Sequence, residues 1–163
     1  MVHVPRSNYK WKTFRMQDLS MILQHQEELY SLNFMNMNFD HVFFSNIREW
    51  YTEGIDKHHC SSNLLLNEQG TLIGFYLYQW NEGTVYLMQM FVVEAFRGRG
   101  FGNLLLEHYE QCGKEQGAAS SFLHASSINE KAVAFYQQNG YFILNEELDE
   151  EGCPRYFMFK NLS

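Results

Sequence analysis

The sequence contains few cysteines and no long apolar run. Cys60, Cys112 and Cys153 are widely separated and form no C-x-x-C pair, which argues against a disulfide framework or a zinc site. No stretch reaches the roughly 18 consecutive apolar residues of a membrane span, and the N-terminus lacks the apolar core of a signal peptide. These absences predict a cytoplasmic protein with reduced thiols, no metal and no membrane association.

Basic charge is scarce as well. Lysine and arginine total 12 against 19 aspartates and glutamates, so the formal net charge is −7 at pH 7. A nucleic-acid-binding domain ordinarily needs a basic face, so this balance argues against a nucleic-acid partner. The hydrophobic content of 45% is typical of a globular protein. At 163 residues without repeats or linkers, the prediction is one domain spanning residues 1–163.

A glycine-rich segment is the most informative stretch. The apolar run 90–93 leads into Arg97-Gly98-Arg99-Gly100-Phe101-Gly102, and a helical pattern begins at Asn103. Glycine lets the backbone approach a ligand closely, and the free N–H groups of a first helical turn favour an anion. The spacing is one residue short of G-x-G-x-x-G, and the lysine of a P-loop is absent. A phosphate cradle is therefore predicted; a basic surface turn or an RNA-binding segment are the alternatives.

Hydrophobic periodicity and turn residues predict the elements. An edge strand is expected at 9–15, and Gly74 inside a strand suggests a bulge or a close backbone approach. Further strands are expected at 63–66, 71–80, 84–93, 118–125, 141–145 and 155–160, and helices at 18–32, 40–51, 103–113 and 126–138. Short turns make the first strands antiparallel, whereas the crossover through 103–113 predicts a parallel pair. The fold class is thus α+β with a mixed sheet.

Two motifs in the right order support a family resemblance. The pattern V-x-x-x-[RQ]-x-x-G-x-G is met by Val93, Arg97, Gly100 and Gly102. The pattern N-x-x-A-x-x-F-Y-x-x-x-G-[FY] is met by Asn129, Ala132, Phe135, Tyr136, Gly140 and Tyr141. Together they resemble the GNAT superfamily of acetyl-CoA-dependent N-acetyltransferases over residues 63–160. The resemblance implies a mostly antiparallel central sheet with one parallel, splayed strand pair and helices on both faces.

The resemblance also implies acetyl-CoA as cosubstrate, without a metal. In this family the glycine-loop amides bind the pyrophosphate, and the preceding strand pairs with pantetheine, here through Phe91 and Val93. The asparagine at position 129 matches the residue that contacts the cofactor arm, although it also suits a simple helix cap. The implied cofactor-binding residues are Phe91, Val92, Val93, Arg97, Gly98, Arg99, Gly100, Phe101, Gly102, Asn103, Asn129 and Tyr136.

The catalytic residue implied by the resemblance is Tyr136, which matches the tyrosine that protonates the leaving thiolate. A phenol with a pKa of about 10 is protonated at neutral pH, although a core aromatic is the plain alternative. Many family members carry a carboxylate where this chain has Gln89. The base therefore stays open among a water chain, which we favour, His124, and direct entry of the neutral amine.

The acceptor implied by the resemblance is a primary amine of a small molecule or peptide. Acidic residues near the expected substrate loops favour a cationic acceptor; they are Glu27, Glu28, Asp40 and residues 149–151. The alternative function is an acetyl-CoA-binding sensor that does not turn over, because Gln89 cannot serve as the base. Homodimers are frequent in the family, so a homodimer is a further expectation.

Overall fold

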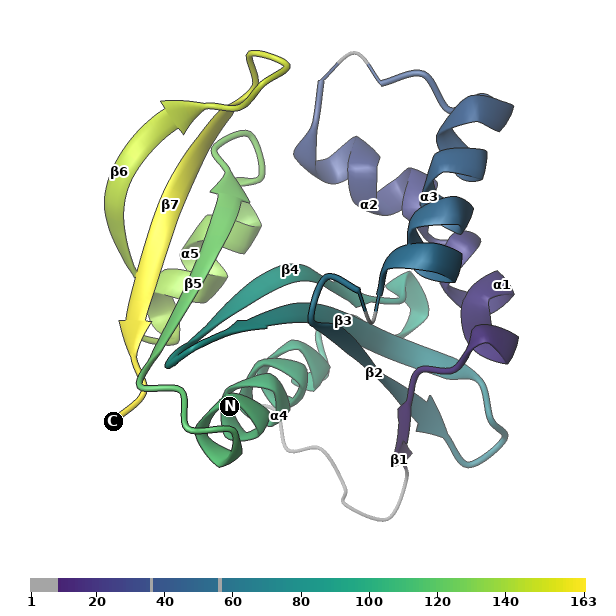
Figure 1. Cartoon of the computed structure of the whole chain (residues 1–163), viewed down its shortest axis with the longest axis horizontal. Helices are drawn as coiled ribbons and strands as arrows, with labels where there is room; N and C mark the ends of the chain where they lie inside the picture. Colours follow the sequence, from purple (N-terminus) through teal and green to yellow (C-terminus); the bar gives the residue numbers. More distant parts are fainter. Residues whose placement is uncertain (1–8, 36, 56) are drawn as a thin grey trace.

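One seven-stranded sheet organises the protein, in the order β1-β2-β3-β4-β5-β7-β6 (Figure 1). The computed structural model describes residues 9–35, 37–55 and 57–163. The strands are β1 (Tyr9–Thr13), β2 (Cys60–Asn67), β3 (Leu72–Asn81), β4 (Thr84–Val92), β5 (Ser120–Ser126), β6 (Phe142–Leu148) and β7 (Pro154–Asn161). Among the described strands only β4 and β5 pair in parallel, and all other neighbours are antiparallel, which confirms the predicted mixed sheet.

The helices differ in detail from the sequence prediction. They are α1 (Leu19–Leu23), α2 (Gln26–Asn33), α3 (His41–Gly54), α4 (Phe101–Glu115) and α5 (Glu130–Gln138), with short 3-10 turns at Met16–Asp18 and Glu94–Phe96. The prediction of a single helix at 18–32 is wrong, because the helix is interrupted at Gln24 and His25. The helix α4 begins at Phe101, two residues earlier than the pattern indicated.

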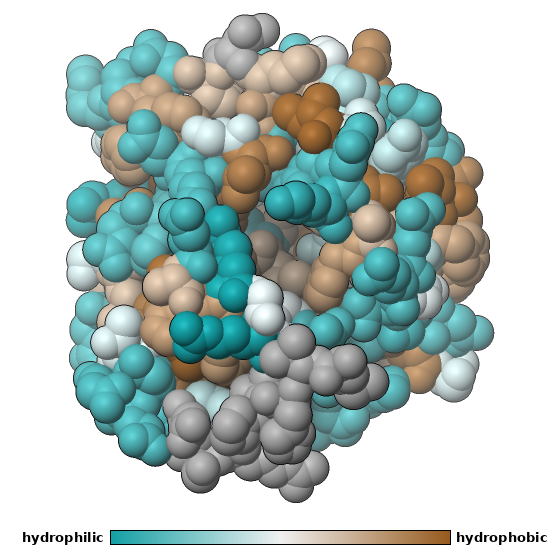
Figure 2. Space-filling view, turned by 180° about the vertical axis from the view of Figure 1, so that it is seen from behind, coloured by the Kyte–Doolittle hydropathy of each residue, from teal (hydrophilic) through white to brown (hydrophobic). Residues whose placement is uncertain are grey.

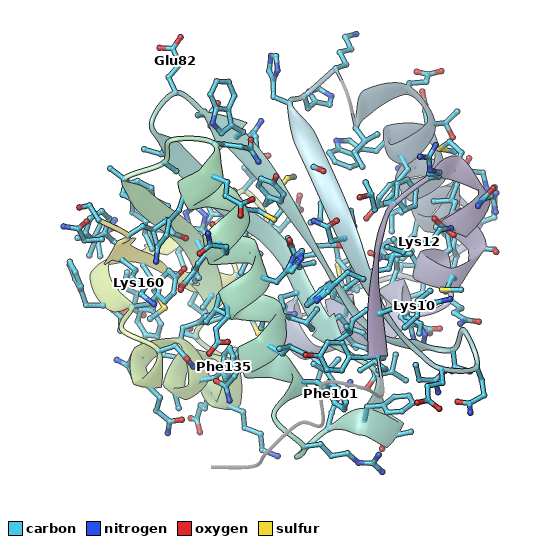
Figure 3. The ribbon with its side chains drawn as sticks, turned by 90° about the horizontal axis from the view of Figure 1, so that it is seen from below. Lys10, Lys12, Glu82, Phe101, Phe135 and Lys160 are labelled. Carbon is cyan, nitrogen blue, oxygen red and sulfur yellow. The ribbon has the colours of Figure 1, made fainter. Side chains whose placement is uncertain are left out.

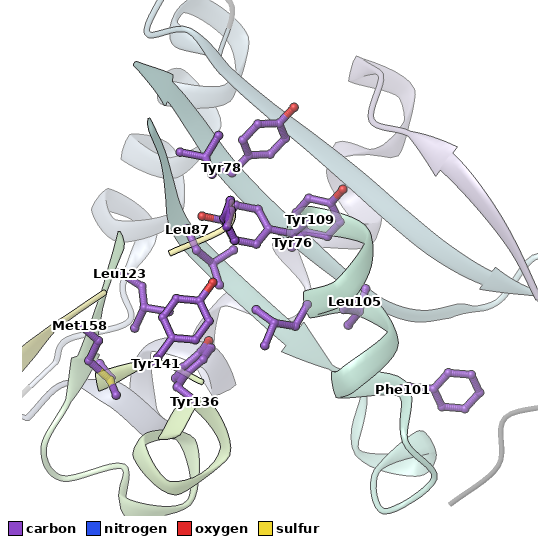
Figure 4. Close-up of a cluster of buried hydrophobic side chains, with 14 of the residues drawn as sticks. Tyr76, Tyr78, Leu87, Phe101, Leu105, Tyr109, Leu123, Tyr136, Tyr141 and Met158 are labelled. Atoms are coloured by element: carbon purple, nitrogen blue, oxygen red, sulfur yellow. The ribbon is translucent and has the colours of Figure 1, made fainter. Parts of the chain in front are cut away.

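Two hydrophobic cores lie on opposite faces of the sheet. The alternation of β3 separates them: Phe75 and Leu77 pack with α1–α3, whereas Tyr76 and Tyr78 pack with α4 (Figure 4). The core on the α4 side continues across the parallel strand pair through Leu123 and onto β7. Helices therefore cover both faces, as predicted, and they support the strands from two sides.

Bulges shape the central strands. Leu65 pairs with Gly74 but Leu66 pairs with Leu72, so Ile73 is an extra residue on β3. A Cβ on Gly74 would lie 2.5 Å from the carbonyl oxygen of Phe91, so no side chain fits there. This confirms the close approach expected at Gly74.

A charged contact connects α4 to the far end of the sheet. The carboxylate of Glu110, a residue only 8% exposed, accepts from Lys160 Nζ at 2.8 and 3.1 Å. It also accepts from the hydroxyl of Tyr141 at 2.9 Å. Figure 3 shows Lys160 reaching from β7 toward α4. The contact fixes the position of the C-terminal strands relative to the helix.

The molecular surface mixes both kinds of side chain. Hydrophobic and hydrophilic residues alternate over the face seen from behind (Figure 2). Within the described part of the chain, no helix combines the length and the hydrophobicity that crossing a bilayer requires.

Candidate active site

The strands β4 and β5 separate in the middle of the sheet. Their pairing covers Thr84–Leu87 against Ser120–Leu123 and extends no further, and Figure 1 shows the strands diverging beyond it. A cavity of about 230 Å³ lies in the gap, with walls from β4 residues 86–91 and β5 residues 123–126. This is the splayed parallel pair that the sequence predicted. The gap exposes a strand edge in the interior of the molecule.

The glycine segment encloses a second cavity at the start of α4. Gly98 has φ +77° and Gly100, the N-cap residue, has φ +86°, a backbone region that favours glycine. The cavity holds about 240 Å³, and Phe101 and Phe135 flank it (Figure 3). Its other lining residues are Val92, Phe96, Arg97, Gly98, Gly100, Gly102 and Asn103. A concave, glycine-lined surface at a helix N-terminus fits an anionic diphosphate.

The two arginines of the segment contact protein groups. Arg97 donates from Nε to the Val92 carbonyl oxygen and from Nη2 to the Glu28 carboxylate, both at 2.9 Å. Arg99 is not among the lining residues, and its guanidinium lies over the ring of Phe96, 5.7 Å from the ring centroid. The cradle therefore depends on backbone groups more than on arginine side chains.

Hydrogen bonding within the sheet decides which backbone groups of β4 face the gap. The Val93 amide donates to the Ile73 carbonyl at 2.8 Å, so it faces β3. Backbone groups alternate sides along a strand, so those of Val92 and Met90 face the open edge. The Val93 amide is therefore already bonded within the sheet, and the pantetheine pairing predicted through Phe91 and Val93 stays a prediction. The Phe91 side chain is buried in the core beneath α1–α3.

Asn129 and Tyr136 lie together in the wall of the β4–β5 cavity. Asn129 Oδ1 accepts from the Ala132 amide at 3.2 Å, which confirms the predicted helix cap. Its Nδ2 donates to Asn33 Oδ1 at 3.0 Å, which joins α5 to α2. Burial raises the pKa of Tyr136 above its ordinary value of about 10, so the phenol stays protonated at neutral pH.

Gln89 lies at the inner end of the same cavity. Leu77 pairs with Gln89 but Tyr78 pairs with Leu87, so Met88 forms a bulge between them. The Gln89 amide exchanges hydrogen bonds with Gln26, at 3.1 Å in one direction and 3.4 Å in the other. The site therefore has a neutral amide pair where many relatives have a carboxylate.

A chain of polar side chains reaches the cavity from the C-terminal strands. The Tyr86 hydroxyl is hydrogen-bonded to His124 Nδ1. His124 Nε2 lies 2.8 Å from Glu147 Oε1, and Arg155 Nε donates to that same oxygen at 2.9 Å. Tyr86, His124 and Arg155 line the cavity. Of these four residues only His124 was predicted from the sequence, because the other three meet it only through strand register.

The protonation states of His124 and Glu147 follow from their surroundings. Burial, and then the positive charge of Arg155, lower the pKa of His124 below its ordinary 6.5. Although desolvation opposes the change, the bonds from Arg155 and His124 lower the pKa of Glu147. The carboxylate accepts, so Nε2 carries the imidazole proton and Nδ1 accepts from Tyr86.

Three of the acidic residues that suggested a cationic acceptor have partners within the protein. Glu28 pairs with Arg97, and Asp40 caps α3 by accepting from the amides of Val42 and Phe43 at 3.1 Å each. Asp149 accepts from the backbone of the β6–β7 turn. Of these residues, Asp149 lines the β4–β5 cavity.

Comparison with known proteins agrees with this geometry. A model of the acetyltransferase (GNAT) family matches residues 21–141. Among curated proteins of Bacillus subtilis, the uncharacterised N-acetyltransferase YdgE is 32% identical over 95 residues, which cover 55% of this chain and 59% of YdgE. The uncharacterised N-acetyltransferase YhfO is 30% identical over 116 residues, covering 60% of this chain and 78% of YhfO. The chain therefore spans little more than half the length of YdgE.

Solved structures share the fold. A spermidine N-acetyltransferase from Vibrio cholerae, in complex with CoA and spermine, has a TM-score of 0.78 at 17% identity, covering 96% of this chain and 97% of that one. The same enzyme in complex with manganese ions has a TM-score of 0.73 at 20% identity, with 96% and 94% covered. At these identities the likeness concerns the fold alone. The match of the family model over residues 21–141, on a sheet that splays beside a glycine cradle, shows that the chain belongs to the acetyltransferase (GNAT) family.

Proposed function

We propose that the protein transfers the acetyl group of acetyl-CoA to a primary amine of a small molecule or peptide. The observation that carries this proposal is that the two cavities follow one another along β4. Val92 lines the glycine cradle and its neighbour Phe91 lines the β4–β5 cavity. An extended ligand with a diphosphate at one end and a thioester at the other matches that path.

Each part of the path has a proposed role. The amides at the start of α4 hold the pyrophosphate, and the free edge at Met90 and Val92 pairs with the pantetheine arm. Asn129 lies beside that arm, and Tyr136 lies near the thioester sulfur. The Vibrio relative, with its bound CoA and spermine, supports a CoA cosubstrate and a small amine acceptor.

Acetyl transfer from a thioester to an amine requires few catalytic groups from the protein. The neutral amine nitrogen attacks the thioester carbonyl carbon, a C–N bond forms, and the C–S bond breaks with its electron pair on sulfur. Tyr136 then donates its phenolic proton to the thiolate, and the proton that the acylated nitrogen releases restores the phenol through solvent. We propose no metal, because a thioester is already activated toward an amine.

The second candidate function is a sensor that binds acetyl-CoA without turnover. It is favoured by the neutral Gln26–Gln89 pair, because neither amide accepts a proton from an ammonium group.

Two measurements on one preparation separate these functions. Calorimetry reports acetyl-CoA binding, and thiol release reports turnover with aromatic and aliphatic monoamines, polyamines, amino acids and a peptide N-terminus. We expect binding together with turnover of at least one amine. Binding with no turnover across the panel supports the sensor, and no binding rejects both functions.

A further inference from the structure

A third cavity lies between α2, α3 and β4. It holds about 400 Å³ and shares Tyr30, Met88 and Gln89 with the wall of the β4–β5 cavity, so it adjoins the proposed thioester position. Four aromatic residues dominate its lining: Tyr30, Phe43, Trp50 and Tyr51. Aliphatic side chains, methionines and neutral amides complete it, and none of the lining residues within 9–35, 37–55 and 57–163 is charged.

One polar atom of this wall has no protein partner. Tyr51 is 2% exposed, and among the described residues its hydroxyl makes no hydrogen bond. A buried donor left unpaired costs about 1–3 kcal/mol, so such a group indicates a missing partner. Burial also raises the pKa of Tyr51, which keeps the hydroxyl neutral. The cavity thus presents apolar rings, and the Tyr51 hydroxyl lies buried in its wall without a hydrogen-bond partner among the described residues.

This chemistry selects among amines. A polyamine carries several ammonium groups, and burying each without a carboxylate is costly. Aromatic walls instead stabilise an aromatic body, at about 0.5–1.5 kcal/mol per ring pair beyond the buried area. We propose, resting on the acetyltransferase function above, that this cavity binds the acceptor. That acceptor is a monoamine with an aromatic or aliphatic body and one neutral polar group that bonds Tyr51.

Matched acceptors test the class. Thiol release is measured with tyramine, phenethylamine, putrescine and spermidine. We expect kcat/KM for tyramine to exceed that for spermidine by about tenfold or more, equal to 1.4 kcal/mol of differential binding. Turnover with spermidine preferred over both aromatic amines overturns the acceptor class and leaves the acetyltransferase function standing.

Variants locate the site. Tyr51→Phe keeps the ring, so we expect it to remove the preference for tyramine over phenethylamine without unfolding the protein. Phe43→Leu is expected to raise the KM for tyramine, whereas Phe142→Leu, at an exposed ring on the β6 edge, leaves the KM unchanged. An unaltered tyramine preference in Tyr51→Phe contradicts the proposal. Calorimetry with tyramine reports binding without catalysis, and absent binding contradicts it too.

The hydrogen-bonded side chains of Tyr86, His124, Glu147 and Arg155 at the β4–β5 cavity support a second inference. Tyr86 comes from β4, His124 from β5, Glu147 from β6 and Arg155 from β7, and the Phe157 ring packs on the imidazole. These bonds orient Nδ1 toward a hydroxyl that lines the cavity. We infer, again on the acetyltransferase function, that Tyr86 takes a proton from the acceptor ammonium while passing its own to His124 Nδ1. Glu147 then stabilises the imidazolium, so this chain replaces the base that Gln89 does not supply.

A pH profile distinguishes this relay from a structural network. Because the pKa of His124 is lowered, the imidazole is neutral at pH 7, and kcat/KM should fall only as pH drops through a value below 6.5. We expect His124→Gln and Tyr86→Phe to lower the rate about 10²-fold. We also expect their pH profiles to lack the fall in kcat/KM that titration of His124 causes at low pH in the wild type. The exposed Glu107→Gln keeps the wild-type profile. An unchanged rate and pH profile in His124→Gln overturns the relay, whereas a wild type without turnover overturns the function itself.

Discussion

Tyr136 combines a buried ring with a place in the cavity wall, so its hydroxyl is shielded from water and kept protonated. Removing that hydroxyl should therefore affect proton donation and little else. We expect Tyr136→Phe to lower kcat about 10²-fold while the acetyl-CoA Kd stays within about twofold. Steady-state thiol release and calorimetry measure the two quantities.

A second tyrosine provides the control. Tyr156→Phe removes a hydroxyl from β7 at a residue that does not line the cavity, and it should leave kcat unchanged. Equal rates in Tyr136→Phe and wild type would exclude the acid role of Tyr136.

The proximity of site residues that share one local segment could be predicted from the sequence. The proximity of site residues that meet through strand register could not. Asn129 and Tyr136 share a helix, so their spacing in sequence fixes their relation in space. Tyr86, Glu147 and Arg155 reach His124 from three other strands. Their meeting depends on sheet order and on the register shift between Ile143 and Asn145, which no local pattern contains.

At the scale of an element, the start of α3 depends on its cap. Asp40 accepts from two amides of the first turn, which otherwise lack partners. We expect Asp40→Ala to lower the free energy of unfolding by about 1 kcal/mol, measured by urea denaturation. Asp40→Asn retains an accepting oxygen and should lose much less; equal losses in both variants would contradict the capping account.

The glycine loop offers a matched pair of backbone positions. Gly98 and Gly70 have φ of +77° and +80°, and an added Cβ would meet nothing within 4 Å at either. Valine at each should cost a similar 1–2 kcal/mol or so of stability, because the left-handed region disfavours a side chain. Only Gly98→Val should weaken acetyl-CoA binding, by about tenfold or more, since Gly98 lines the cradle.

Calorimetry on both variants checks this pair. Retained affinity in Gly98→Val would show that the loop does not approach the ligand. The loop itself was predictable because its glycines follow an apolar strand directly. The break between α1 and α2 was not, because residues 18–32 keep helical spacing through Gln24 and His25, and only packing reveals the interruption.

For the whole molecule, the Glu110–Lys160 contact joins α4 to the C-terminal strands. Lys160→Met leaves a nearly buried carboxylate without its partner, which we expect to cost about 2 kcal/mol; the side chain of Lys160 is 28% exposed, which reduces the loss. Thermal unfolding measures it. Lys160→Arg keeps the charge and should restore most of the stability, and an equal loss in both variants would argue against an electrostatic cause.

The splay of β4 from β5 has a mechanical consequence. Four residue pairs are the whole backbone connection between the halves of the sheet, so side chains such as Leu87 and Leu123 carry much of the join (Figure 4). A ligand arm that pairs with the free edge fills the place of a missing strand. On the proposed function, acetyl-CoA would support the sheet as well as react, and we expect its binding to slow amide exchange along the diverging parts of β4 and β5, an effect that product release reverses.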